Sequence, residues 1–296
     1  MAVGDKVQLE DWSFTNGLQY TSYGFWNVNP SGSDSQPIYA GVYAGGKPGV
    51  SQTTSMPTTG SATYSGGATG LVVEPGATSS GADGGRFTGA SSLTANFTTS
   101  AITGSISGIT VYTVNNGSGG PTLIGTLNDI GLSATISGAA FNGTADVTGA
   151  AGTAFDITGA TGKLHGAFYG PSAAEATGVF YLTGGTNNVS VAGSFGAKQT
   201  TPSDRRLKID IEPAGTTDQG LQLYSWRYLG GERRFTGVMA QDLLANSRFA
   251  EAVEIAEDGL MAVDYAQIGL SPADFDAMVR EGRAALDRYR AARAHS

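Results

Sequence analysis

The chain has 296 residues, of which 45 are glycine and none is cysteine, and its formal net charge is −8. The lack of cysteine excludes a disulfide framework and a thiolate metal site. An acidic chain has no general attraction for phosphates, so we expect no nucleic-acid partner. With no cysteine and no clustered carboxylates, we also expect no metal and no cofactor. The length is sufficient for two or three domains.

Residues 1–19 precede the first expected strand. The opening Met1-Ala2-Val3-Gly4-Asp5-Lys6 lacks the basic and apolar regions of a secretory signal. No later stretch is apolar for long enough to cross a bilayer. We therefore expect synthesis in the cytoplasm and no membrane insertion, and we expect the N-terminal segment to attach the chain to a larger assembly.

Residues 20–198 carry little charge, and between residues 51 and 197 the only basic side chains are those of Arg86 and Lys163. Short runs of loosely alternating residues end in Gly or Asn, as antiparallel strands do. Many short strands joined by tight turns favour a closed barrel, which leaves no exposed edge. We predict a mostly β chain with an antiparallel up-and-down β-barrel of about eight strands. The clearest runs are 61–64, 93–97, 105–112 and 189–195.

Three motifs follow one another in this block: Tyr23-Gly24-Phe25-Trp26, then residues 56–66, then residues 166–175 with Phe168-Tyr169-Gly170-Pro171. Their order resembles that of the barrel of transferrin-binding protein B and related bacterial surface barrels, over roughly residues 20–198. The resemblance implies binding of host iron proteins, haem or complement factors through loops outside the motifs. No binding residue can be carried over from such loops.

The third motif has a physical interpretation of its own. Gly170-Pro171 should force a turn, and Glu175 should accept hydrogen bonds from backbone N–H groups. Phe168 and Tyr169 alternate along a strand, so one of them should face the barrel interior. We therefore interpret this motif mainly as a signature of the fold.

Other candidate sites in the block are weak. His165 lies on an expected strand and is more typical of a structural histidine than of a metal ligand, and His295 is next to the last residue. Glycoside hydrolysis normally needs two facing carboxylates, which the sequence does not suggest. The acidic residues stand isolated among small and apolar ones: Asp129, Asp146, Asp156 and Glu175.

Residues 199–202 have the character of a linker, because the composition changes abruptly after them. From Ser203 onward there are twelve Lys or Arg and fifteen Asp or Glu residues. We predict a small α+β domain over residues 203–296 that ends in a helix. Ser271 should cap that helix, and Pro272 should occupy its first position. Its apolar stripe is Phe275, Met278, Gly282, Leu286 and Tyr289, which could pack on the domain itself or on other copies.

The domain opens with Ser203-Asp204-Arg205-Arg206-Leu207-Lys208. By residue type alone, Ser-Asp before a charged run is an ordinary opening of a helix or turn. Ser203 also supplies a hydroxyl, and Lys208 supplies an amine five residues later. A lysine can act as a base only if burial or a neighbouring cation lowers its pKa.

Downstream motifs add to this hexapeptide: Ile211, then 224–228, 237–242 and 263–265. Together they are similar to the intramolecular chaperone domain of phage endosialidases and tail fibres, from Ser203 to the end of the chain. The resemblance implies a domain that trimerises, templates the folding of the fibre before it and is then cut off immediately before the motif serine.

Carried over, the scissile bond is Pro202–Ser203. Ser203 would attack the carbonyl of Pro202, Lys208 would take the proton, and the resulting ester would hydrolyse. Asp204 and Arg206 would orient the turn or pair with each other. The resemblance thus implies a single-turnover auto-endopeptidase, for which we expect no external substrate.

These expectations combine into a homotrimeric phage or prophage tail-fibre or spike protein, located in the virion. Its barrel would meet a host-surface receptor, and residues 1–19 would join other virion or fibre proteins. The alternative is a secreted or surface-exposed bacterial protein that binds an iron protein or haem and carries a borrowed chaperone domain.

Overall fold

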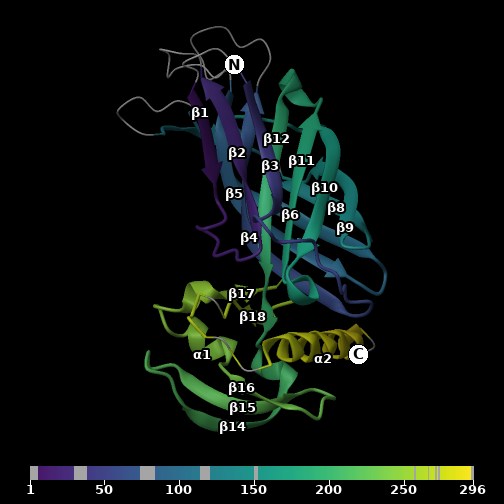
Figure 1. The fold of residues 1–296 in the computed structure, drawn as a ribbon, viewed down its shortest axis with the longest axis vertical. Coiled ribbons are helices and arrows are strands. Elements are labelled where there is room, and N and C mark those ends of the chain that lie inside the picture. Colours follow the sequence, from purple (N-terminus) through teal and green to yellow (C-terminus); the bar gives the residue numbers. More distant parts are fainter. Residues whose placement is uncertain are drawn as a thin grey trace. The chain divides into compact units, whose positions relative to one another are not determined.

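The computed structural model describes residues 6–29, 39–73, 84–113, 121–149, 153–256, 258–265, 267–270, 272 and 274–294. The chain divides into two compact units. The first consists of Met1–Pro57 and Tyr64–Lys198, and the second consists of Thr58–Thr63 and Gln199–Ser296. Each unit has its own sheets and its own buried core (Figure 1).

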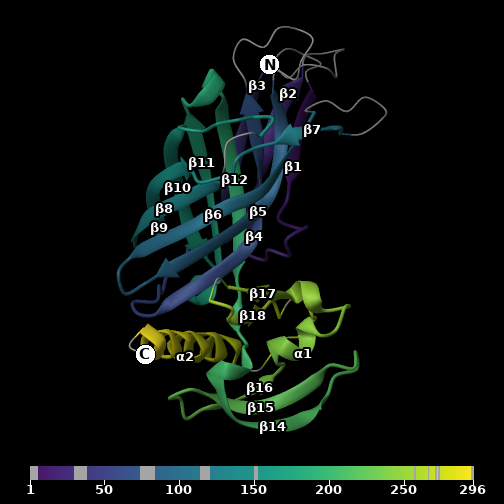
Figure 2. The same cartoon turned by 180° about the vertical axis from the view of Figure 1, so that it is seen from behind.

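The first unit contains a closed barrel of eight antiparallel strands, seen from two sides in Figures 1 and 2. Consecutive barrel strands are neighbours, and the pairing of β5 with β6 closes the ring, while β7 (Leu123–Thr126) extends the sheet beside β6. The predicted up-and-down barrel is confirmed. Its strands are β4 (Ser61–Val73), β5 (Gly84–Asn96), β6 (Ala101–Tyr112), β8 (Ile130–Ser137), β9 (Ala140–Val147), β10 (Thr161–Tyr169), β11 (Glu175–Thr183) and β12 (Ser190–Gln199).

Aromatic side chains fill the barrel because alternate residues of each strand point inward. Phe168 is fully buried. Its ring centroid lies 5.7 Å from that of Tyr64, 5.8 Å from that of Phe97 and 5.2 Å from that of Phe141. Phe168 is thus the interior member of the Phe168-Tyr169 pair, as the alternation predicted.

A separate antiparallel sheet belongs to the same unit: β1 (Lys6–Asp11), β2 (Thr21–Asn29) and β3 (Tyr39–Gly46), in that order. The motif at residues 23–26, expected within the barrel, lies on β2. The Ser194 hydroxyl of β12 donates a hydrogen bond to the Gly24 carbonyl at 2.9 Å, which ties this sheet to the barrel. An aromatic motif indicates a buried strand, but long-range pairing decides which sheet the strand joins.

The second unit is the predicted α+β domain with a C-terminal helix. It has two three-stranded sheets, ordered β13-β18-β17 and β14-β15-β16, and a core centred on Trp226, Tyr228 and Met239. Its elements are β13 (Thr201–Pro202), β14 (Lys208–Thr216), β15 (Gln222–Tyr228), β16 (Arg234–Gly237), α1 (Ala240–Leu244), β17 (Val253–Ile255), β18 (Met261–Val263) and α2 (Phe275–Ala294).

The terminal helix differs from the prediction at its start. Helix α2 begins at Phe275, and Pro272 lies outside it, because Asp274 has a left-handed φ of 59° that a right-handed helix cannot include. The proposed cap Ser271 is outside the described residues. The predicted stripe does pack on the domain's own core, where Met278 and Leu286 are buried.

Candidate functional site

The segment at residues 199–202, expected as a linker, is mostly buried, and it comprises the last residue of β12, Thr200 and strand β13. Thr201 pairs with Val263 and Pro202 with Ala262 across β13 and β18. A proline is tolerated here because β13 is an edge strand, where a missing N–H removes no ladder hydrogen bond. The candidate bond Pro202–Ser203 therefore lies at the end of a paired strand, inside the second unit.

Asp204 caps the short turn that follows this bond. Its Oδ1 accepts hydrogen bonds from the backbone N–H of Arg206 at 2.8 Å and from Arg206 Nε at 2.9 Å, and its Oδ2 lies 2.7 Å from Arg206 Nη2. Burial opposes ionisation, but these hydrogen bonds hold the pKa of Asp204 below its ordinary value. Asp204 therefore does both things that the sequence suggested: it orients the turn, and it forms an ion pair with Arg206.

The turn brings Ser203 and Lys208 together. Lys208 Nζ lies 3.5 Å from Ser203 Oγ, and both side chains are buried, with 0% and 5% of their surfaces exposed for serine and lysine respectively. A nucleophile and a base normally lie within about 3.2 Å, and often lie further apart in resting structures. The separation is thus at the edge of hydrogen-bond reach.

Lys208 is held by neutral groups. Its Nζ donates to the Val238 carbonyl at 2.8 Å, approaches Met239 Sδ at 3.6 Å and lies 3.7 Å from the centroid of the Trp226 ring. Burial lowers the pKa of Lys208 well below its ordinary value of 10.5. An amine in this environment favours its neutral form, which is the form able to accept a proton from a hydroxyl.

Both sides of the candidate peptide bond are also hydrogen-bonded. The Tyr228 hydroxyl donates to the Pro202 carbonyl oxygen at 2.6 Å, and the Ser203 N–H donates to the Met261 carbonyl at 3.0 Å. The Tyr265 hydroxyl lies 3.4 Å from Ser203 Oγ. The sequence placed Tyr228 only on an aromatic strand. Its contact with Pro202 has no local sequence signal, because the two residues lie 26 positions apart and meet only in the folded domain.

The barrel motif serves the fold. Gly170 has a φ of 77° and precedes a short turn beginning at Pro171, as predicted. The Glu175 carboxylate accepts four hydrogen bonds from residues 19–21, which confirms its expected role as an acceptor of backbone N–H groups. The donors are the N–H groups of Gln19 (2.6 Å), Tyr20 (3.0 Å) and Thr21 (2.9 Å) and the hydroxyl of Thr21 (2.8 Å).

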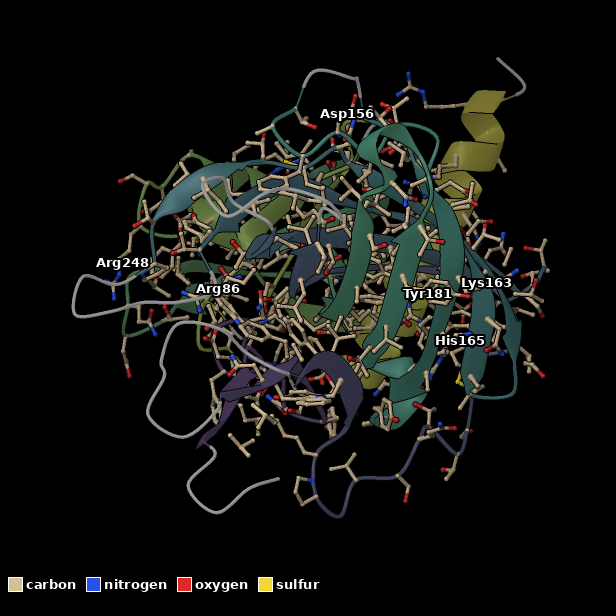
Figure 3. All side chains as sticks on the ribbon, turned by 90° about the horizontal axis from the view of Figure 1, so that it is seen from above. Arg86, Asp156, Lys163, His165, Tyr181 and Arg248 are labelled. Atoms are coloured by element: carbon tan, nitrogen blue, oxygen red, sulfur yellow. The ribbon has the colours of Figure 1, made fainter. Side chains whose placement is uncertain are left out.

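His165 lies on the outer side of β10, near Lys163 on the same strand and Tyr181 on β11 (Figure 3). Its Nδ1 is 2.6 Å from the side-chain oxygen of Asn142, its partner on β9. In the described part of the chain, no three His, Asp or Glu side chains gather as they would around a metal ion. His295 is outside the described residues. Of the helices described, none is long and apolar enough to span a bilayer.

Two family models match the chain in sequence. Residues 56–199 match the model of the C-lobe and N-lobe β-barrels of transferrin-binding protein B. Residues 203–254 match the model of the chaperone of endosialidase. The chain is therefore similar to the first family over its barrel and to the second over the segment that follows, in the order that the motifs indicated. A search of curated proteins gave no match.

Solved structures resemble the chain only loosely. Intact Ap-TbpB is 20% identical with a TM-score of 0.46, over 67% of this chain and 37% of that one. Transferrin-binding protein B from serogroup B Neisseria meningitidis is 20% identical with a TM-score of 0.42, over 68% and 34%. HpuA from Kingella denitrificans, in complex with human haemoglobin, is 21% identical with a TM-score of 0.32, over 62% and 55%. The chain spans less than two thirds of the length of each of these proteins.

Proposed function

We propose that the segment from Ser203 onward is an assembly domain that trimerises, guides folding of the chain before it, and then cuts itself off at Pro202–Ser203. The observation that carries this proposal is the buried contact between Ser203 Oγ and Lys208 Nζ, adjacent to that bond. The match of residues 203–254 to the chaperone of endosialidase supports it. The chain is then a single-turnover auto-endopeptidase.

The reaction balances without any external group except water. Ser203 Oγ bonds to the carbonyl carbon of Pro202 while Lys208 Nζ takes the hydroxyl proton, and the carbonyl π electrons move to oxygen. When the carbonyl re-forms, the C–N bond breaks and Lys208 returns the proton to the Ser203 nitrogen. Water then hydrolyses the ester between Pro202 and Ser203 Oγ, giving a Pro202 carboxylate, a free Ser203 hydroxyl and a proton that the new Ser203 amino group takes up.

For the whole chain, the proposed function is that of a phage or prophage tail-fibre or spike protein in the virion. The barrel meets a host-surface receptor, and residues 1–19 join other virion or fibre proteins. The support is the order of the two matches, a barrel similar to those of transferrin-binding protein B followed directly by a segment similar to the chaperone of endosialidase.

A second candidate function is supported by the match of residues 56–199 to the barrels of transferrin-binding protein B. In this version the protein is secreted or displayed on a bacterial surface, binds an iron protein or haem, and uses the chaperone segment for assembly. Detection of the protein in purified virions and its absence from the bacterial surface and culture medium would reject this version. The reverse distribution would reject the virion version.

The experiment that tests the cut is the intact mass of the freshly made full-length chain beside Ser203→Ala and Lys208→Ala. The parent should yield a fragment ending at Pro202, and neither variant should. A parent that stays whole rejects the peptidase function. Light scattering on the uncut Ser203→Ala chain tests assembly separately, with a trimer expected and a monomer contradicting it.

A further inference from the structure

The carbonyl of the candidate bond has an unusual partner. The Tyr228 hydroxyl lies 2.6 Å from the Pro202 oxygen, at the short end of the range for hydroxyl donors. Tyr228 is fully buried, and Pro202 is buried as well. A hydroxyl that is held in place in a buried, low-dielectric site polarises a carbonyl oxygen more strongly than a water molecule in bulk solvent does.

Strand pairing places this hydroxyl and the candidate base together. Lys208 of β14 and Tyr228 of β15 are directly opposite partners in the register. Opposite residues of paired strands project to the same face of a sheet. One cross-strand pair thus supplies the amine near Ser203 Oγ and the hydroxyl on the Pro202 oxygen.

The tyrosine ring is fixed on several sides. Its centroid lies 6.0 Å from that of Trp226 and 5.7 Å from that of Phe235. Gly282 of α2 lies so close that a Cβ atom there would be 2.9 Å from Tyr228 Cζ. Helix α2 therefore needs a residue without a side chain at this position, and the hydroxyl cannot easily leave the Pro202 oxygen.

On the premise that the chain cuts itself at Pro202–Ser203, we propose that Tyr228 is a catalytic residue of the reaction. Its hydroxyl stabilises the negative charge that forms on the Pro202 oxygen when Ser203 Oγ adds to the carbonyl carbon. It keeps its own proton throughout, because Lys208 carries the proton from Ser203 Oγ to the leaving nitrogen. Tyr228 therefore supplies the electrophilic half of the site, which the Ser203–Lys208 pair lacks.

The ionisation of Tyr228 is consistent with this function. Burial raises the pKa of Tyr228 well above its ordinary value. The hydroxyl therefore remains a donor at neutral pH, and burial also shifts the amine of Lys208 toward its neutral form. The low-dielectric surroundings thus favour a protonated tyrosine and an unprotonated lysine.

The test compares two tyrosines of β15. Tyr228→Phe removes the hydroxyl and keeps the ring, and Tyr224→Phe removes a hydrogen bond of the same 2.6 Å length, from Tyr224 to Asp242, away from the bond. The full-length chain is refolded from urea by dilution, and intact mass is followed with time. We expect Tyr228→Phe to slow cleavage by about 10²–10³-fold, the usual effect of losing one such donor, while Tyr224→Phe stays close to the parent.

The outcomes separate the two proposals. A parent that is never cut rejects the proposed function itself. A parent that is cut, with Tyr228→Phe cut at the same rate or both variants slowed equally, rejects the role of Tyr228 alone. Folding is checked by thermal unfolding of Ser203→Ala with and without Tyr228→Phe. If the second change unfolds the chain, a fluorinated tyrosine placed at position 228 alone replaces it. Its more acidic hydroxyl should speed cleavage, and an unchanged rate overturns the inference.

Discussion

The barrel unit buries the carboxylate of Glu175, and the C-terminal unit buries the amine of Lys208, with 3% and 5% of their surfaces exposed. Glu175 accepts four short hydrogen bonds from the 19–21 segment. Lys208 donates one short hydrogen bond, to the Val238 carbonyl, and its other polar and aromatic contacts among the described residues are a hydroxyl at 3.5 Å, a sulfur and an aromatic ring.

The difference decides what each group can do. A buried charge with matched partners stabilises a fold, and removing those partners is costly. A buried amine without a countercharge in contact shifts toward its neutral form and becomes a base. Although both groups are equally buried, the carboxylate of Glu175 therefore stabilises the fold of its unit, and the amine of Lys208 becomes a reactive base.

The largest expected effect comes from replacing the amine. Lys208→Met keeps an unbranched apolar chain over the Trp226 ring, where sulfur packs well. Self-cleavage should fall by about 10²–10⁴-fold, because the general base is lost. The thermal unfolding temperature of the uncut chain should stay equal or rise, because no amine has to be desolvated. A clear fall in that temperature would mean that Lys208 is a structural group like Glu175.

The matching change in the barrel should act on stability and not on cleavage. Glu175→Gln places an amide NH₂ against at least one backbone N–H of residues 19–21, which should cost about 2–3 kcal/mol of unfolding free energy. Urea unfolding in the Ser203→Ala background measures this loss. Glu10→Gln, which weakens the partly exposed pair with Arg86, is the control and should cost under about 1 kcal/mol. Equal losses would remove the contrast between the two units.

The cleavage rate should depend on pH through Lys208. The neutral amine is the active form, so the rate should rise about tenfold per pH unit below the lowered pKa and level off above it. The charges of Asp204 and Asp242 act to raise that pKa, and the charge of Arg205 acts to lower it further. Each of these three effects is smaller than the effect of burial. A rate that falls as pH rises would contradict a neutral lysine base.

The same group affects stability with a defined sign. The pKa of Lys208 is lowered on folding, so between that lowered value and 10.5 the unfolded chain binds one more proton than the folded chain. Over that window the free energy of unfolding should rise with pH. The slope attributable to Lys208 is the difference between the uncut Ser203→Ala chain and the same chain with Lys208→Met. No difference would mean that the amine is protonated in the folded chain.

Local patterns predicted much of this fold and part of the site. Alternation located the barrel strands, Gly170-Pro171 located the turn, and the spacing of Met278 and Leu286 identified the buried face of α2. The five-residue separation of Ser203 and Lys208 was sufficient to suggest the candidate pair. Each of these signals lies within one element or one turn, where sequence distance and spatial distance agree.

Long-range pairing accounts for what the sequence did not indicate. The aromatic motif at residues 23–26 joined a separate sheet, and the left-handed backbone at Asp274 delayed the start of α2. The contact of Tyr228 with Pro202 depends on the register of β14 against β15 and on the position of β13, none of which has a local signal.

Asp204 gives the smallest and most specific prediction, because it is a nearby carboxylate that pairs with Arg206 and not with Lys208. Asp204 lies four residues before Lys208, but both of its oxygens accept hydrogen bonds from Arg206, and Oδ2 also accepts one from the Met261 N–H. Arg206→Ala should leave the negative charge of Asp204 less compensated, so the pKa of Lys208 should rise. The midpoint of the pH–rate profile should then move upward by less than about one pH unit, which is under about 1.4 kcal/mol.

Arg206→Lys is the control for this change, because it keeps the positive charge and loses the two-pronged geometry. Its midpoint should lie between those of the parent and Arg206→Ala. A lower plateau with an unmoved midpoint would instead show that Arg206 only positions the turn through Asp204. In that case the neutral state of Lys208 would depend on burial alone, and the separation of Asp204 from the amine would have no part in making Lys208 a base.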